Sequence, residues 1–164
     1  LLAFREHFTD AIAKQKNLQC LEIGPFDCPL LKGSHVKYFD VLDSEQLLVR
    51  ANEHQRATLD VPYIDYVEPS GSLGLVNDTF DFVFSSHCIE HQPNLINHLN
   101  EVKSILNVNG VFALIVPDKR YCFDHYIPET NVAEIIDAHK TDLKTHSLRS
   151  IIEHRSLTTH NDPL

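Results

Sequence analysis

Hydrophobic and polar positions alternate along this chain with two different periods. Apolar residues in the first sixteen positions recur about one helical turn apart, which predicts an amphipathic helix over 1–16. The same spacing predicts further helices over 44–55, 94–106, 131–140 and 147–155. Short, nearly continuous apolar runs predict buried strands over 19–23, 35–41, 63–67, 80–86 and 111–117. Strands that alternate with helices are typical of an α/β domain with a parallel sheet.

Local signals predict where some of these elements begin and end. Ser44 is suited to cap the second helix, and Asn131 with Glu134 forms a capping pair for the fourth. Gly110 is expected to end the helix over 94–106 in a left-handed conformation. That helix is expected to bury a face made of Leu95, Leu99, Val102 and Leu106.

Length and composition indicate one domain over 1–164, with 43% hydrophobic and 23% charged residues. The net charge of -9 disfavours nucleic acid or an anionic membrane as a partner, because both would be repelled. No segment approaches the ~20 apolar residues of a membrane span. Four cysteines without CxxC spacing indicate free thiols and a cytoplasmic location. The chain has no methionine, so we expect a piece of a longer protein.

Candidate ligand-binding residues follow the predicted strands, because ligands of open parallel sheets bind at the carboxyl ends near the point where strand order reverses. Acids at the first three strand ends suit a ligand with hydroxyls, an amine and a cationic centre, and suit a pyrophosphate poorly. A dinucleotide site is disfavoured because the motif G-x-G-x-x-G is absent. The residues concerned are Glu22, Gly24, Asp27, Asp40, Asp43, Asp65, Glu68, Ser85, Ser86, His87, His91, Asp118, Lys119 and Arg120.

Four segments carry a resemblance to a known family: "LEIG", "VKYFDVLD", "FDFVFSSHCIEH" and "HLNEVKSILNVNGVFALIVPD". Together they resemble class I S-adenosylmethionine-dependent methyltransferases over 21–118, most specifically the small-molecule branch in the third and fourth segments. The segment "PDKRYCFD" is similar to a subgroup associated with bacterial glycan biosynthesis. The resemblance implies a Rossmann-like, doubly wound, mostly parallel α/β sheet with helices on both faces. The last strands of the family's sheet are not visible in this sequence.

The resemblance also implies roles for residues at the first two strand ends. Glu22 matches the acid that reaches the methionine amino end of S-adenosylmethionine, and Gly24 the glycine that lets the backbone approach the cofactor. Pro25 stands where the family's loop continues with further glycines. Asp40 matches the acid that binds both ribose hydroxyls. About ten residues separate Gly24 from the second strand, so we expect a single turn or an extended crossing instead of a helix.

At the third and fourth strand ends, the resemblance assigns the adenine amino group to Glu68 or Asp65. It places Ser86 and His87 beside the methyl-bearing sulfur. His87 and His91 lie four apart, which raises the alternative of zinc. No third ligand at a suitable spacing accompanies them, so no metal is expected.

The segment "PDKRYCFDHY" follows the fifth strand, where the acceptor of the methyl group is expected to lie. Histidine is the side chain best suited to take a proton near neutral pH, so His87 and His125 are the candidate bases. Asp118 is a candidate orienting partner. The sequence therefore predicts methyl transfer to a small-molecule or glycan-related acceptor. The alternative is a non-catalytic domain that keeps the fold within a larger glycan-processing protein.

Overall fold

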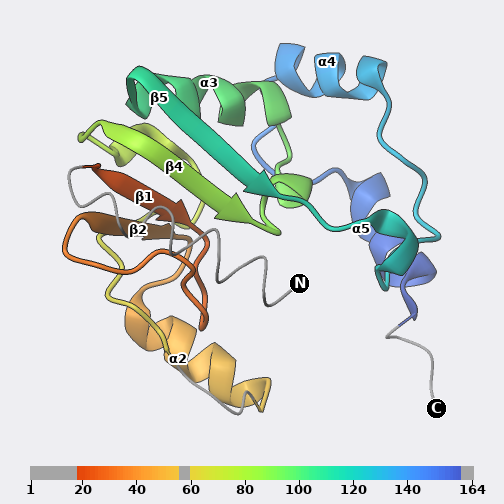
Figure 1. The fold of residues 1–164 in the computed structure, drawn as a ribbon. Coiled ribbons are helices and arrows are strands. Elements are labelled where there is room, and N and C mark those ends of the chain that lie inside the picture. Colours follow the sequence, from red (N-terminus) through yellow and green to blue (C-terminus); the bar gives the residue numbers. More distant parts are fainter. Residues whose placement is uncertain (1–17, 56–59, 160–164) are drawn as a thin grey trace.

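A computed structural model describes residues 18–55 and 60–159 of the chain. The helix expected over 1–16 lies outside these residues. Five parallel strands form one sheet in the order β3-β2-β1-β4-β5 (Figure 1). The expected α/β fold with a parallel sheet is confirmed. The strands are β1 (Cys20–Ile23), β2 (Val36–Asp40), β3 (Tyr66–Val67), β4 (Phe80–Ser86) and β5 (Leu106–Ile115).

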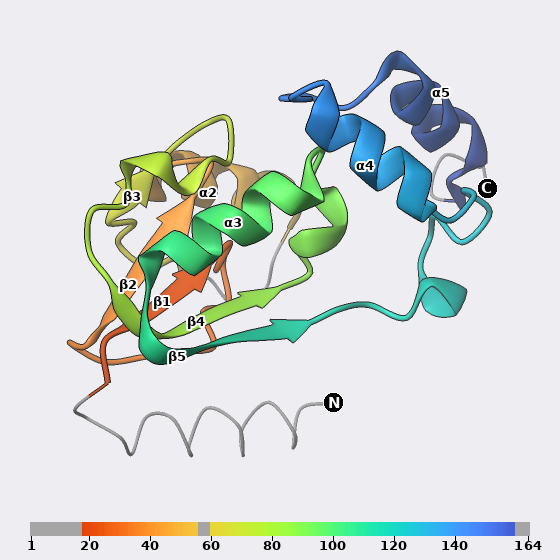
Figure 2. The ribbon, with the colours of Figure 1, turned by 90° about the horizontal axis from the view of Figure 1, so that it is seen from above.

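Helices connect or follow these strands, as the apolar periodicity predicts. Figures 1 and 2 both place α4 and α5 on the side toward which the strands point. No helix in the described part of the chain is long and apolar enough to cross a membrane. The α-helices are α2 (Ser44–Glu53), α3 (Leu95–Ile105), α4 (Val132–Lys140) and α5 (Leu148–Leu157), and the 3-10 turns are η1 (Leu73–Leu75), η2 (Ile89–His91) and η3 (Lys119–Tyr121).

Alternate residues of the strands fill two apolar clusters, one on each face of the sheet. On one face Leu21 and Ile23 pack in a cluster with Val102 and Ile105 of α3. On the other face a second cluster contains Cys20, Leu31, Val36, Phe82 and Phe84. Burying one such large apolar side chain stabilises the fold by about 1.5–3 kcal/mol. Apolar residues therefore pack on both faces of β1, β2 and β4, which explains the near-continuous apolar sequence of these strands, whereas β5 is less buried than its sequence predicts, with Val111 53% and Leu114 39% exposed.

The cap of α2 differs from the expectation. Asp43, and not Ser44, is the N-cap residue: its Oδ1 accepts the Gln46 N–H at 2.8 Å, while Gln46 Oε1 accepts the Asp43 N–H at 3.0 Å. The Ser44 hydroxyl instead accepts the N–H of Ile64 at 3.0 Å. The capping pair of Asn131 and Glu134 is confirmed.

The end of α3 also differs from the expectation. No C-capping loop separates α3 from β5, because the helix ends at Ile105 and the strand begins at Leu106. The left-handed residue is Asn109, with φ 68°, in a bulge where β5 fits extra residues between its pairs with Phe80 and Phe82 of β4. Gly110 is needed for space, since a Cβ there would lie 2.9 Å from the Asn107 carbonyl oxygen.

The buried face of α3 is rotated slightly from the expected one. It consists of His98, Val102 and Ile105, whereas Leu99 is 42% exposed. His98 is 3% exposed, and neither ring nitrogen has a hydrogen-bond partner among the residues that the structure describes. The sequence pattern missed this residue because histidine is not counted among apolar side chains.

Candidate functional site

A hollow of about 600 Å³ lies at the carboxyl ends of the strands, between α2 and the segment after β4. Because it reaches from the end of β2 to the end of β4, it spans the point beside β1 at which strand order reverses. Three of the candidate ligand-binding residues, Asp40, His87 and His91, line it together. Its full lining is Phe26, Asp40, Leu47, Arg50, His54, His87 and His91.

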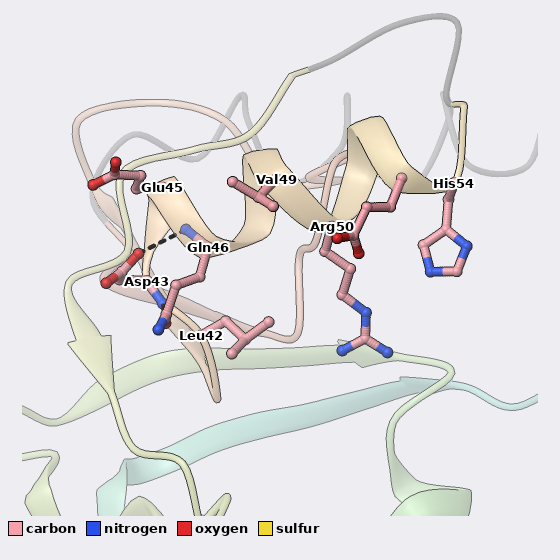
Figure 3. Close-up of a pocket in the computed structure, with 8 residues that line it drawn as sticks. Leu42, Asp43, Glu45, Gln46, Val49, Arg50 and His54 are labelled. Carbon is pink, nitrogen blue, oxygen red and sulfur yellow. Dashed lines mark hydrogen bonds between the residues drawn. The ribbon is translucent and has the colours of Figure 1, made fainter.

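A second hollow runs along α2 and shares Arg50 and His54 with the first. Figure 3 shows both side chains near the end of α2, projecting to the side on which the sheet strands lie. Of the candidate residues, this second hollow contains Asp43 alone, which caps α2, whereas the first contains Asp40, His87 and His91. The hollow at the strand ends is therefore the candidate site, and we call it the strand-end hollow.

Asp40 is the buried acid of the strand-end hollow, with 7% of its surface exposed. Its Oδ1 accepts the N–H groups of Val41 at 2.7 Å and Leu42 at 3.3 Å. Burial raises the pKa of this carboxyl, while the backbone N–H groups of Leu42, Val41 and Phe26 act in the opposite direction. A buried carboxylate held by the backbone in this way is a preorganised acceptor for ligand hydroxyls.

Gly24 has φ +69°, a conformation that side-chain-bearing residues rarely adopt. A Cβ at this position would lie 2.4 Å from Cys88 Sγ. Cys88 lies beside the end of β4, with its Sγ 3.5 Å from the Ile23 carbonyl oxygen. Burial raises the pKa of the Cys88 thiol to about 11, so it stays protonated and fills space. The close approach that requires Gly24 is thus made by Cys88, a residue that the sequence analysis did not single out.

Glu22 is only 2% exposed and does not line the strand-end hollow. Its carboxylate accepts the N–H groups of Leu30, at 2.9 and 3.0 Å, and Leu31, at 2.8 Å. These bonds fold the connection between β1 and β2 back over the end of β1. That connection contains turns and no helix, as its length predicts. Pro25 is buried in it, and its carbonyl accepts the Cys28 N–H at 3.1 Å.

The two candidate adenine-binding acids, Asp65 and Glu68, lie at opposite ends of β3. Glu68 directly follows β3, and its N–H donates to the Asp40 carbonyl at 3.1 Å. Asp65 precedes β3, and its Oδ2 accepts the Tyr38 N–H at 2.9 Å. Only Glu68 therefore stands at the carboxyl edge beside Asp40. Its side chain accepts the Ser70 N–H at 3.2 Å.

Ser86 is the last residue of β4 and His87 follows it, and the Ser86 Oγ lies 2.9 Å from His87 Nδ1. His87 has φ 56°, which is unusual for a residue with a side chain, and its N–H donates to the Ile115 carbonyl at 2.9 Å. The backbone turn directs an exposed imidazole to the strand-end hollow, where His91 also contributes. Within 18–55 and 60–159, no group of three or more His, Cys, Asp or Glu side chains could hold a metal ion.

His125 and Asp118 do not line the strand-end hollow. His125 Nδ1 lies 2.9 Å from the Cys122 carbonyl oxygen, so in the neutral ring Nδ1 carries the proton and Nε2 the lone pair. Asp118 caps η3 and pairs with Arg120, and these hydrogen bonds lower the pKa of its carboxyl. Among the described residues Asp118 contacts Arg120 and no histidine, so its role as an orienting partner stays a prediction.

Phe26, Arg50 and His54 also line the strand-end hollow, and the sequence analysis missed all three. A signal for two of them exists, because Arg50 and His54 lie four apart on the helix that follows Asp40 and so share a helix face. Phe26 has φ 49° in the turn after β1, which no local pattern indicates.

Comparisons with known proteins point in one direction. The model of a family described as a methyltransferase domain matches residues 24–114. A solved structure from Galdieria sulphuraria, provisionally identified as a sarcosine dimethylglycine methyltransferase, is 18% identical with a TM-score of 0.47; the match covers 69% of this chain and 46% of that one. A coclaurine N-methyltransferase structure, bound to N-methylheliamine and SAH, is 15% identical with a TM-score of 0.45 and coverage of 69% and 34%. The chain thus spans less than half the length of either protein. No curated protein matches it.

Proposed function

Because this chain belongs to the methyltransferase domain family, we propose that it transfers a methyl group from S-adenosylmethionine to a small-molecule or glycan-related acceptor. One observation carries the proposal. The matched segment, 24–114, contains the residues that follow β1 and β2 and the whole of β4, and it includes every residue that lines the strand-end hollow. The family assignment and the hollow at the reversal of strand order thus fall on the same residues.

The residues at the hollow fit the cofactor. Asp40 is a buried carboxylate whose backbone hydrogen bonds orient it, so it suits the two ribose hydroxyls. Glu68, beside it at the same edge, suits the adenine amino group. Gly24 and Pro25 directly precede Phe26, which lines the hollow from the segment after β1. Glu22 supports the cofactor through this segment, because its carboxylate is bound to the N–H groups of Leu30 and Leu31.

When bound, S-adenosylmethionine supplies a methyl group attached to a positively charged sulfur. The protein has to position the acceptor, exclude water and, for a hydroxyl acceptor, take up the proton that the reaction releases. His87, beside Ser86 at the end of β4, is the proposed base because it lines the hollow. His125 is the second candidate, with the Nε2 lone pair available in its neutral form.

The proposal is tested by titrating the protein calorimetrically with S-adenosylhomocysteine. Two hydrogen bonds to a charged carboxylate contribute about 1.5–3 kcal/mol each. The isosteric change Asp40→Asn weakens both, and we expect a loss of about 3 kcal/mol, or a roughly 100-fold higher Kd.

Asp81→Asn is the matched control. Asp81 is an acid at the opposite, amino end of β4, where it accepts the Gln19 N–H at 2.9 Å. Its removal should leave the Kd unchanged. Failure of the unmodified protein to bind S-adenosylhomocysteine contradicts the proposal and favours the non-catalytic alternative. Equal effects of the two substitutions contradict the role of Asp40.

A further inference from the structure

One arginine and three histidines gather on the strand-end hollow, although the chain as a whole has a formal net charge of -9 with histidine counted as neutral. Arg50 and His54 line it from α2, and His87 and His91 line it from the segment after β4. One acid, Asp40, accompanies them. We propose that this cluster binds an anionic group, a carboxylate or a phosphate, carried by the methyl acceptor. This inference rests on the proposed function and specifies its substrate class.

The pairing of the arginines supports the inference. Arg120 bonds to Asp118, and Arg149 bonds to Glu134 and Glu153. Arg50, by contrast, forms no ion pair with any described residue, although Asp40 lines the same hollow. Its charge does reach Asp40, because it helps to lower the pKa of that carboxyl against the larger effect of burial. Arg50 therefore presents at the hollow a guanidinium that has no ion-pair contact among the described residues.

The geometry of the cluster suits an anion with several oxygens. Arg50 and His54 stand one turn apart at the end of α2 and project in the same direction (Figure 3). The guanidinium fork donates two parallel hydrogen bonds to a carboxylate or phosphate, and an imidazole can donate a further one. His87, the proposed base, and His91 line the hollow from the segment after β4. A group held there keeps the acceptor beside the proposed base.

A simpler explanation applies to Arg50 alone, because a basic residue in the last turn of a helix interacts favourably with the helix dipole. Lys103 also lies in the last turn of its helix, α3, is exposed as Arg50 is and does not line the hollow. Lys103→Gln therefore removes the same helix-end charge as Arg50→Gln without touching the cluster. It is the matched control.

The experiment measures binding of inorganic phosphate by 31P NMR at neutral pH. The protein is first titrated with S-adenosylhomocysteine, and phosphate is then titrated with and without a saturating amount of that ligand. We expect saturable phosphate binding that Arg50→Gln weakens at least about fivefold, because a bidentate charge-assisted contact is lost. His54→Gln should weaken it less. Lys103→Gln should leave both phosphate binding and the Kd of S-adenosylhomocysteine unchanged.

Two results would overturn the inference. In the first, Arg50→Gln and Lys103→Gln have the same effect on phosphate, so the charge acts only at the helix end. In the second, Arg50→Gln weakens S-adenosylhomocysteine and leaves phosphate unaffected, so Arg50 serves the cofactor. The proposed function fails separately, by absence of S-adenosylhomocysteine binding in the unmodified protein.

Discussion

Replacing Gly24 by alanine tests why a glycine follows the first strand. Two penalties are expected. The first is backbone strain, since φ is +69° and a residue with a Cβ pays about 1–2 kcal/mol in this region. The second is overpacking, because the new Cβ would lie 2.4 Å from Cys88 Sγ. Forcing an extra methyl group into a filled site costs about 1–3 kcal/mol. Gly24→Ala should therefore lower the free energy of unfolding by about 2–5 kcal/mol.

Gly71 separates the two penalties. It has a similar φ of +75°, but an added Cβ would lie 3.8 Å from its nearest neighbour, Val41 Cγ1, at ordinary contact distance. Gly71→Ala should therefore show the strain alone, about 1–2 kcal/mol. Combining Gly24→Ala with Cys88→Ala removes the sulfur. The double variant should therefore lack the loss of stability caused by overpacking and keep the loss caused by backbone strain.

Urea denaturation followed by circular dichroism measures these free energies, and a double-mutant cycle isolates the pairwise part. We expect a coupling of about 1–3 kcal/mol between positions 24 and 88. The reasoning is refuted if Gly24→Ala destabilises no more than Gly71→Ala, or if Cys88→Ala gives no recovery. The Cys88 sulfur would then move away from the new methyl group at no cost in free energy, and overpacking would not explain the glycine at position 24.

Three further predictions concern buried ionisable groups. Glu22→Gln should destabilise by about 2–4 kcal/mol and speed amide exchange at Leu30 and Leu31, which bond to this carboxylate; unchanged exchange contradicts its loop-holding role. Burial lowers the pKa of His98, so the stability that the neutral imidazole contributes is lost as pH falls below the ordinary histidine pKa of about 6.5. As pH is lowered from 7 to 5, the melting temperature of His98→Leu should therefore rise relative to that of the unmodified protein. Parallel melting curves would contradict this. Burial raises the pKa of Asp40, so the stability that this residue contributes is present below about pH 3.9 and is lost as pH rises through its folded pKa. Without ligand, the melting temperature of Asp40→Asn should therefore rise relative to that of the unmodified protein from acid to neutral pH. A difference in melting temperature that stays constant with pH would contradict this expectation.

The elements of the fold could be predicted from the sequence, because hydrophobic periodicity and capping chemistry are local. The strand over 80–86 and the capping pair of Asn131 and Glu134 are present as predicted. Errors arose where two local signals compete. Ser44 and Asp43 are both good caps, and Asp43 forms the capping box because Gln46 lies three residues after it. Gly110 looked like a helix end, but the chain passes directly from helix to strand.

The candidate site was partly predictable, because parallel strands bring their carboxyl ends to one edge. That rule placed Asp40 and His87 together, and both line the strand-end hollow. The rule does not state which way a side chain turns. The side chain of Glu22 follows the regular alternation of side chains along β1, yet its carboxylate accepts hydrogen bonds from the N–H groups of Leu30 and Leu31.

The sequence by itself therefore determined the parallel α/β architecture, the short crossing after the first strand and the acids and histidines at the strand ends. Only the tertiary structure decided how these groups are used. Gly24 meets Cys88 across the sheet, and Arg50 reaches the strand-end hollow from α2, because strand order and helix packing bring together residues that are distant along the chain. Such contacts depend on how the backbone crosses from strand to strand, and a pattern that repeats every two or four residues carries no information about that path.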